Sequence, residues 1–272
     1  MSGSHWQPKE PRWAIGTAVF AFVSVLLYVA SILVRPLDPA RGTGLWFGVA
    51  ATVLFVVEAL YPVRRGALSK PLGNARRWIQ LHIWGGLLAA LFVLVHAGFR
   101  KPGGTMGWLL LLLTLWVTFT GLFGVFLQKY YPVALSRNLS VEVLFDRIPE
   151  VAQKLADEAE KLVQNTSDVL QGFYQTEVRP ALAGAAPSWN YLVDVRGGRE
   201  KRLQPFQRIM QFLPEEERPR LEDLKTIYVE KLELDAHFAV QRVLRTWTIL
   251  HVPPAAVLLA LMTLHVAAFF LY

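Results

Sequence analysis

Four of the six histidines lie in two apolar stretches and share one spacing. His82 and His96 are 14 residues apart, and so are His251 and His265. On an α-helix this is close to four turns, so both rings of a pair lie on one face, about 40° out of register and ~21 Å apart along the axis. Two such helices side by side offer two bis-imidazole sites, His82 with His251 and His96 with His265. A six-coordinate haem iron takes one imidazole on each side, so the spacing predicts two stacked b-type haems.

The elements that carry these histidines are predicted membrane spans. The chain has 272 residues, of which 53% are hydrophobic and 12% are aromatic. A stretch of ~20 apolar residues is long enough to cross the hydrocarbon core of a bilayer. Five stretches approach or exceed that length, namely 13–34, 45–63, 78–99, 107–131 and 246–272. We therefore expect an all-α integral membrane bundle of five transmembrane helices, with the first span retained rather than cleaved as a signal peptide.

The polar stretch between the fourth and fifth spans forms a separate region. We divide the chain into transmembrane helices 1–4 (residues 1–131), an extramembrane insert (132–245) and a fifth helix that completes the bundle (246–272). Residues 141–178 have apolar side chains at helical spacing and predict one or two amphipathic helices. Several Pro and Gly residues in 179–212 predict loops with one short hairpin. Helical spacing resumes at Glu215 and continues into the last span, so the insert is expected to be mostly helical.

Charge is distributed unevenly and predicts the orientation. Residues 132–245 carry 16 basic and 18 acidic side chains, whereas the rest of the chain carries 12 basic and only 3 acidic ones. This juxtamembrane excess of positive charge argues against nucleic acid as a partner and fits a lipid membrane. Near the span ends, eight basic residues lie on the side of the N-terminus (Lys9, Arg12, Arg64, Arg65, Lys70, Arg76, Arg77, Lys129) and four on the other (Arg35, Arg41, Arg100, Lys101). The positive-inside rule then predicts a cell (inner) membrane protein whose N-terminus and insert are cytoplasmic and whose C-terminus is external.

Other residues near the histidines could help to hold a porphyrin. Gly85 and Gly86 follow His82 by one turn, while Gly121 and Gly124 lie on the span between the two histidine-bearing spans. Absent side chains would let a porphyrin approach the backbone, although small-residue helix packing explains them equally well. Several basic residues could pair with haem propionates or snorkel to the headgroups, namely Arg76, Arg77, Arg100, Lys101, Arg242 and Arg245.

These pieces resemble the core of the cytochrome b family of quinol–cytochrome c reductases. The stretch His82-Ile-Trp-Gly85, with His96 and Arg100 further on, is similar to the first haem-binding helix of that family. The stretch that begins His251-Val-Pro-Pro254 and continues to His265 is similar to the second haem-binding helix. Residues Phe119–Gly124 resemble the glycine-bearing helix that lies between the two in that family. The resemblance covers only the third to fifth spans and implies haem ligation at the four histidines.

The chain also departs from that family in two ways. Two spans precede the first histidine-bearing span, an arrangement closer to ferric-reductase-like membrane domains. The family's outer quinol-site motif of Pro-Glu-Trp-Tyr type is missing, and the polar insert occupies that connection. The resemblance therefore implies haem ligation but not bifurcated quinol oxidation.

From these patterns we expect a di-haem cytochrome b, an electron-transfer subunit of a membrane oxidoreductase complex. The chain has no cysteine, which excludes c-type haem attachment and thiolate-held clusters within it. One end is therefore expected to meet a quinone or quinol, and the other a partner subunit bearing flavin, iron–sulfur or c-type haem. Two alternatives stay open. One is a quinone-independent transmembrane reductase with an external acceptor, and the other is a non-redox membrane anchor or transporter whose histidines bind a metal or relay protons.

Two further residues give weaker signals. Glu58 lies in the second span with Tyr61 nearby, either to exchange protons with a quinone or, as the more common case, to snorkel to the interface. His237 lies 14 residues before His251 and repeats the haem spacing, which raises a third cofactor as one reading. A packing or solvent-exposed histidine beside Asp235 is the default interpretation for His237.

Overall fold

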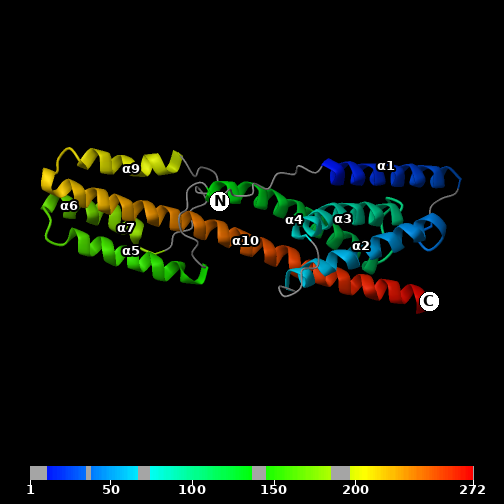
Figure 1. Ribbon diagram of the computed structural model, residues 1–272. Helices are drawn as coiled ribbons and strands as arrows, with labels where there is room; N and C mark the ends of the chain where they lie inside the picture. The colour runs from blue at the N-terminus through cyan, green and yellow to red at the C-terminus, as the bar shows by residue number, and fades with distance from the viewer. Residues whose placement is uncertain (1–10, 35–37, 67–73, 137–144, 185–196, 272) are drawn as a thin grey trace. The chain divides into compact units, whose positions relative to one another are not determined.

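The computed structural model describes residues 11–34, 38–66, 74–136, 145–184 and 197–271, and every regular element among these is a helix. Five helices are long and apolar enough to cross a membrane. They are α1 (Pro11–Val34), α2 (Gly42–Gly66), α3 (Ala75–His96), α4 (Thr105–Ser136) and the apolar part of α10 (Arg218–Leu271). The predicted fold class is therefore confirmed, and the chain is an all-α, multi-pass membrane protein (Figure 1).

The chain divides into two compact units. We call residues 1–128 with 247–272 the membrane unit, and residues 129–246 the insert unit. Helix α10 supplies its residues from 247 onwards to the first and its residues up to 246 to the second. Of the basic residues used for the orientation, Lys9, Arg35 and Lys70 lie outside the described residues.

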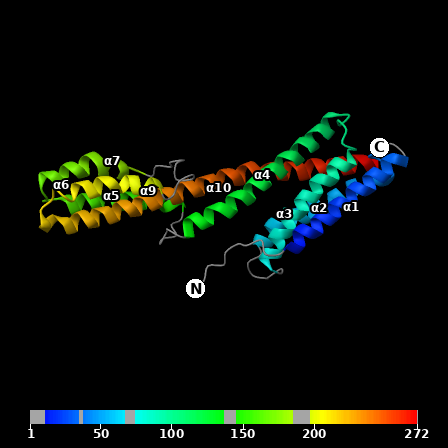
Figure 2. The same cartoon turned by 90° about the horizontal axis from the view of Figure 1, so that it is seen from above.

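Within the membrane unit, α3 packs against both α1 and α2, and the two views show the three helices side by side (Figure 1, Figure 2). The contact between α2 and α3 is close because small side chains lie in it. Ala51, Ala89 and Ala90 are buried, and the rings of Phe47 and Phe92 meet edge to face with their centroids 5.4 Å apart. Small residues let apolar helices approach each other where lipid supplies no hydrophobic driving force.

Helix α3 ends at His96, three residues before the predicted end at Phe99. The chain turns there because Gly98 takes a left-handed conformation with φ of 62°, and its N–H donates to the Val95 carbonyl. Phe99 also has a positive φ of 53°, which is uncommon for a bulky residue. Tyr28 of α1 holds this turn, because its ring packs on Phe99 and its hydroxyl donates to the Gly98 carbonyl at 3.3 Å.

Helix α10 continues through Pro253 and Pro254. Proline has no N–H, so Pro254 leaves the Leu250 carbonyl without its usual helical donor. The indole Nε1 of Trp116 in α4 donates to that carbonyl at 2.9 Å. Backbone polar groups within a membrane need such partners because no water is present to satisfy them. This bond ties α4 to α10 one residue before His251.

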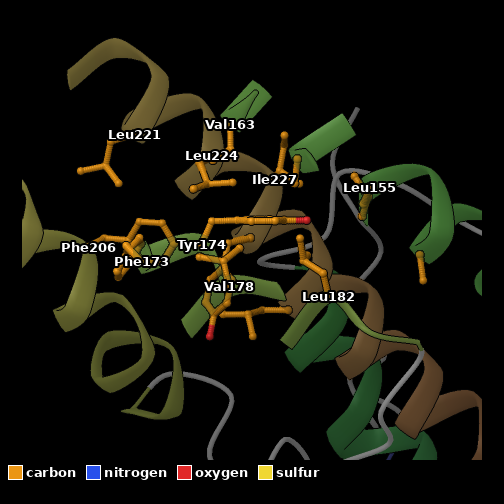
Figure 3. Close-up of a cluster of buried hydrophobic side chains, with 14 of the residues drawn as sticks. Leu155, Val163, Phe173, Tyr174, Val178, Leu182, Phe206, Leu221, Leu224 and Ile227 are labelled. Atoms are coloured by element: carbon orange, nitrogen blue, oxygen red, sulfur yellow. The ribbon is translucent and has the colours of Figure 1, made fainter. Parts of the chain in front are cut away.

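The insert unit is a small helical domain around one apolar core. Its elements are η1 (Phe145–Arg147), α5 (Ile148–Val163), α6 (Asp168–Phe173), η2 (Tyr174–Val178), α7 (Arg179–Leu182), α9 (Gly197–Ile209), η3 (Glu215–Glu217) and the first part of α10. The apolar residues of α5 recur at helical spacing and are all buried: Ile148, Ala152, Leu155, Ala159 and Val163. Side chains from α5, α6, η2, α7, α9 and α10 converge on this core (Figure 3).

One part of the insert differs from its prediction. Loops with a hairpin were expected over 179–212, but α7 and α9 cover much of this range, and Pro205 lies inside α9. Proline and glycine lower helix propensity without forbidding a helix whose apolar face is buried, and Phe206 of α9 is 2% exposed in the core. Residues 185–196, the remaining part of the range predicted to hold a hairpin, lie outside the described residues.

A buried ion pair lies in the same unit. The Lys231 side chain is 1% exposed and that of Asp235, one turn later in α10, is 5% exposed. The Lys231 ammonium donates to both carboxylate oxygens at 2.8 and 2.7 Å and to the Ala181 carbonyl at 3.2 Å. All three ammonium protons therefore have acceptors, as a buried charge requires.

Candidate functional site

The four intramembrane histidines meet as two ring pairs between α3 and α10. The ring centroids of His82 and His251 are 6.3 Å apart with an interplanar angle of 86°. Those of His96 and His265 are 6.4 Å apart with an angle of 81°. Because the pairs match in chain order, α3 and α10 run in the same direction and present the pairs at two depths.

These distances match two imidazoles on opposite sides of one metal ion. A metal–imidazole bond is about 2.0–2.1 Å long, and a ring nitrogen lies ~1.15 Å from its centroid. Two collinear rings that share an ion therefore have centroids roughly 6.3–6.5 Å apart. A direct N–H···N hydrogen bond of about 2.9 Å would instead bring the centroids to roughly 5.2 Å. Each separation is therefore compatible with one ion held between the two rings.

Zinc sites are built differently. A structural zinc ion takes four ligands, and a catalytic one takes three protein ligands. Over the described ranges, no group of three or more His, Asp and Glu side chains is arranged to hold a metal ion. A pair of imidazoles without a third protein ligand is instead a donor set that suits a haem iron.

Thr120 of α4 fixes the ring of His251. The His251 side chain is buried, and its Nδ1 lies 2.9 Å from Thr120 Oγ1. The single hydroxyl proton of Thr120 goes to the Trp116 carbonyl at 2.9 Å, shared with the Val117 carbonyl at 3.1 Å. With that proton on a carbonyl, the hydroxyl accepts from Nδ1–H, and Nε2 is then the unprotonated nitrogen of a neutral His251.

His96 has a comparable arrangement made by the backbone of α2. Its Nδ1 lies 2.9 Å from the Gly44 carbonyl, which accepts a hydrogen bond from Nδ1–H and leaves Nε2 as the unprotonated nitrogen of the neutral ring. Gly48, one turn later, lies directly against the ring. A Cβ placed there would be 2.7 Å from Nδ1 and 2.8 Å from Cε1 of His96. Nothing larger than glycine fits at position 48 while the ring stays in place.

His82 differs because a carboxylate contacts its ring. Glu58 of α2 pairs with Nδ1 of His82, and its side chain is only 10% exposed. Glu58 therefore does not snorkel to the interface, which was the more common expectation. Tyr61 stacks on the same imidazole with ring centroids 5.0 Å apart. Gly85 makes room for the carboxylate, because a Cβ there would collide with Glu58 Oε1.

Two glycines of α4 lie against residues of α10: Gly121 against His251 and Gly124 against Trp247. A Cβ at Gly121 would be 3.3 Å from His251 Cε1, and one at Gly124 would collide with the Trp247 indole. That indole stacks on the His251 ring with centroids 5.7 Å apart and donates to the Thr120 carbonyl at 2.7 Å. Of the glycines singled out from the sequence, Gly86 alone has open space at its Cβ position.

The predicted propionate partners lie at the ends of the ligand helices. Arg77, five residues before His82, and Arg100, four residues after His96, are both exposed. Arg245 belongs to the insert unit and pairs there with Asp146 at 3.5 Å. His237 also belongs to that unit, where the Gln241 amide lies 3.1 Å from its Nδ1, as the packing interpretation of this residue expects.

The sequence pointed to the four histidines that the structure brings together in pairs. It also pointed to Glu58, but as a residue that exchanges protons with a quinone or snorkels, not as a partner of His82. It gave no indication of Thr120, Gly44, Gly48 or Trp247. The available signals were weak: a threonine and two glycines within spans, and a tryptophan at a span edge. Comparison with known proteins adds no relative, because no family model, curated protein or solved structure matches the chain.

Proposed function

We propose that the protein is a di-haem b-type cytochrome that carries electrons across the membrane as one subunit of an oxidoreductase complex. The observation that carries this proposal is the pair of facing imidazoles at each of two depths, with centroids 6.3 and 6.4 Å apart. Both separations are compatible with two imidazoles that share one ion and are longer than a direct hydrogen bond between the rings would give.

In this proposal, His82 and His251 hold the inner haem, and His96 and His265 hold the outer one. Bound haem iron supplies a one-electron change at each depth. The protein contributes the orientation of the rings: Glu58, Thr120 and the Gly44 carbonyl each occupy an Nδ1 and leave Nε2 for the iron. Along α3 the two ligands are ~21 Å apart, so the two sites together cover most of a ~30 Å hydrocarbon core.

The residues around the histidines complete each proposed site. Gly48 and Gly121 leave the imidazoles in place where any side chain would displace them, and Gly85 does the same for Glu58. Arg77 and Arg100 are exposed at opposite ends of α3, where each can pair with a haem propionate. Gly86 lies one turn from His82 on the same helix face with open space beside it, which suits a flat porphyrin edge.

The partners follow from what the chain lacks. Without cysteine it holds neither an iron–sulfur cluster nor a c-type haem, so electrons must arrive from and leave to other molecules. We propose a quinone or quinol at one end and a subunit bearing flavin, iron–sulfur or c-type haem at the other. The insert unit is the proposed docking surface for that subunit, on the cytoplasmic side of the inner membrane by the charge count. The resemblance of the third to fifth spans to cytochrome b supports the same assignment.

Purification of the full chain from haem-replete cells tests the proposal. The protein should be red, with the α-band of a reduced bis-histidine b haem and two haems per chain by pyridine haemochrome. His82→Ala and His251→Ala should remove the same haem, and His96→Ala and His265→Ala should remove the other. His237→Ala is the matched control and should retain both haems. A colourless wild-type protein would refute the proposal.

A further inference from the structure

Glu58 is an unusual residue for the interior of a membrane bundle. Residues 1–128 and 247–272 contain three acidic side chains, at positions 10, 38 and 58, and only Glu58 lies within a span. Its side chain is 10% exposed, and its contact with Nδ1 of His82 is the only polar contact of its carboxylate with the described chain. A carboxylate is costly at such a position, so its retention next to a candidate ligand indicates a function in that site.

The two histidine pairs differ in the group that contacts Nδ1. At His251 and His96, Nδ1 meets neutral acceptors, the Thr120 hydroxyl and the Gly44 carbonyl respectively. Basic residues near the span ends are more numerous on the His82 side, eight against four, and their charge acts in the opposite sense to that of a carboxylate. Those whose side chains are described are exposed, so solvent screens them more than it screens the buried Glu58. One buried carboxylate therefore distinguishes the His82/His251 site from the His96/His265 site.

We infer that Glu58 is a positioning residue that sets the reduction potential of the His82/His251 site below that of the His96/His265 site. This inference rests on the proposed function. A carboxylate that accepts from Nδ1–H makes the imidazole a stronger donor at Nε2. When the carboxylate is ionised, its negative charge in a medium of low dielectric constant also favours Fe(III) over Fe(II). Both effects lower the potential of the site next to Glu58.

The order of potentials gives a direction. With haem bound at both sites, this order would favour one-electron transfer from the site next to Glu58 to the His96/His265 site, and no proton transfer would be needed. The Glu58 end is then the end that meets the electron donor, a quinol or a reduced flavin or iron–sulfur group. The His96 end meets the one-electron acceptor.

The geometry around Glu58 supports a fixed position of the carboxylate. Gly85 provides the space that Oε1 occupies, because a Cβ there would collide with that oxygen. The His82 ring is stacked on Tyr61 with centroids 5.0 Å apart, so the imidazole is constrained by Tyr61 as well as by the carboxylate. Replacing either Glu58 or Gly85 therefore perturbs the same contact from opposite sides.

The test is a redox titration of the purified full chain, followed at the α-band, together with a count of haems per chain. Variants with a single haem site assign each reduction potential of the titration to its site. His96→Ala leaves only the His82/His251 site, and His82→Ala leaves only the His96/His265 site. Glu58→Gln keeps an acceptor for Nδ1 but removes the charge. Its matched control is Asp38→Asn, which removes the charge of an exposed carboxylate whose Oδ1 accepts from the Ala40 N–H at 2.9 Å. Gly85→Ala displaces the carboxylate, with Gly16→Ala of α1, where a Cβ meets nothing within 4 Å, as its control.

We expect the lower potential in the variant that keeps only the His82/His251 site. Glu58→Gln should raise that potential by about 59 mV, which is a tenfold change in the preference for Fe(III) over Fe(II), and should leave the other component and the haem count unchanged. Gly85→Ala should also raise the reduction potential of the His82/His251 site. The two control variants, Asp38→Asn and Gly16→Ala, should leave the potentials of both sites unchanged. If Glu58→Gln loses that haem, the order of the two single-site potentials and the Gly85→Ala shift decide the question.

In a protein that binds two haems per chain, as the proposed function requires, three results would overturn the inference about Glu58. One is a lower potential at the His96/His265 site. Another is a Glu58→Gln protein with unchanged potentials, and the third is an equal shift in Asp38→Asn. A wild-type protein without haem would instead refute the proposed function itself.

Discussion

Under the proposed function, replacing Gly48 by alanine should weaken haem binding at the His96/His265 site and nowhere else. The added Cβ at position 48 would lie 2.7 Å from Nδ1, 2.8 Å from Cε1 and 3.3 Å from Cγ of His96. Ordinary contacts between such atoms are about 3.5–4.0 Å. The ring must therefore move by roughly 1 Å, away from the α2 backbone and out of its 2.9 Å contact with the Gly44 carbonyl.

The expected cost follows from these contacts. Adding a methyl group to a packed contact costs about 1–3 kcal/mol. Since 1.4 kcal/mol is a factor of about ten, the affinity for haem at this site should fall by roughly 5- to 150-fold. Alanine also raises helix propensity by up to about 1 kcal/mol relative to glycine. That gain stabilises the apo and the haem-bound protein alike, so it cancels in the affinity.

The assay is a haemin titration of apo-protein carrying a single remaining site. In a His82→Ala, His251→Ala background only the His96/His265 site is left, and Gly48→Ala should reduce its affinity. In a His96→Ala, His265→Ala background the same change should have no effect. Gly16→Ala controls for the alanine itself, because a Cβ there meets nothing within 4 Å. Equal affinity with and without Gly48→Ala in the first background would refute the reasoning.

Three further changes test other contacts. Lys231→Ala leaves the buried Asp235 carboxylate without its cation, so it should lower the free energy of unfolding of the insert unit by about 3–5 kcal/mol, as measured by urea denaturation; an unchanged midpoint would contradict this. Thr120→Val removes the hydroxyl that contacts His251 Nδ1 and should weaken haem binding at that site roughly 10- to 100-fold. Thr118→Val should not, because the Thr118 hydroxyl donates to the Thr114 carbonyl four residues earlier. Trp116→Phe should lower the free energy of unfolding by about 1–3 kcal/mol, measured by thermal denaturation, because the Leu250 carbonyl then has no donor in place of the indole. An unchanged melting temperature would mean that another donor satisfies this carbonyl.

The helical spans were predictable because apolar length is a local property of the sequence. Each of the five predicted stretches lies within or largely overlaps a helix of the structure. Boundaries were less predictable where a tertiary contact sets them. The turn after His96 is the example, since Tyr28 packs on Phe99 and binds the Gly98 carbonyl from another helix.

In α9 the sequence-based prediction of secondary structure itself was wrong. Its glycines and Pro205 predicted loops, yet residues 197–209 are helical. Propensity is a weak preference of a fraction of a kcal/mol for most residues, and burial of a large aromatic side chain such as Phe206 outweighs it. The sequence pattern was too short to reveal which core that ring would enter.

Sequence alone determined the helices, the membrane as their environment, and the equal spacing that places two imidazoles on one face of each histidine-bearing span. Those properties depend on the helical period and on hydropathy, which any short stretch of chain carries in itself. Only the tertiary structure decided that Glu58 meets His82, that Thr120 meets His251 and that Gly44 meets His96. These partners lie 24, 131 and 52 residues apart in the chain. Hydrogen bonds act over about 3 Å, so such contacts exist only after helices distant in the sequence have packed together.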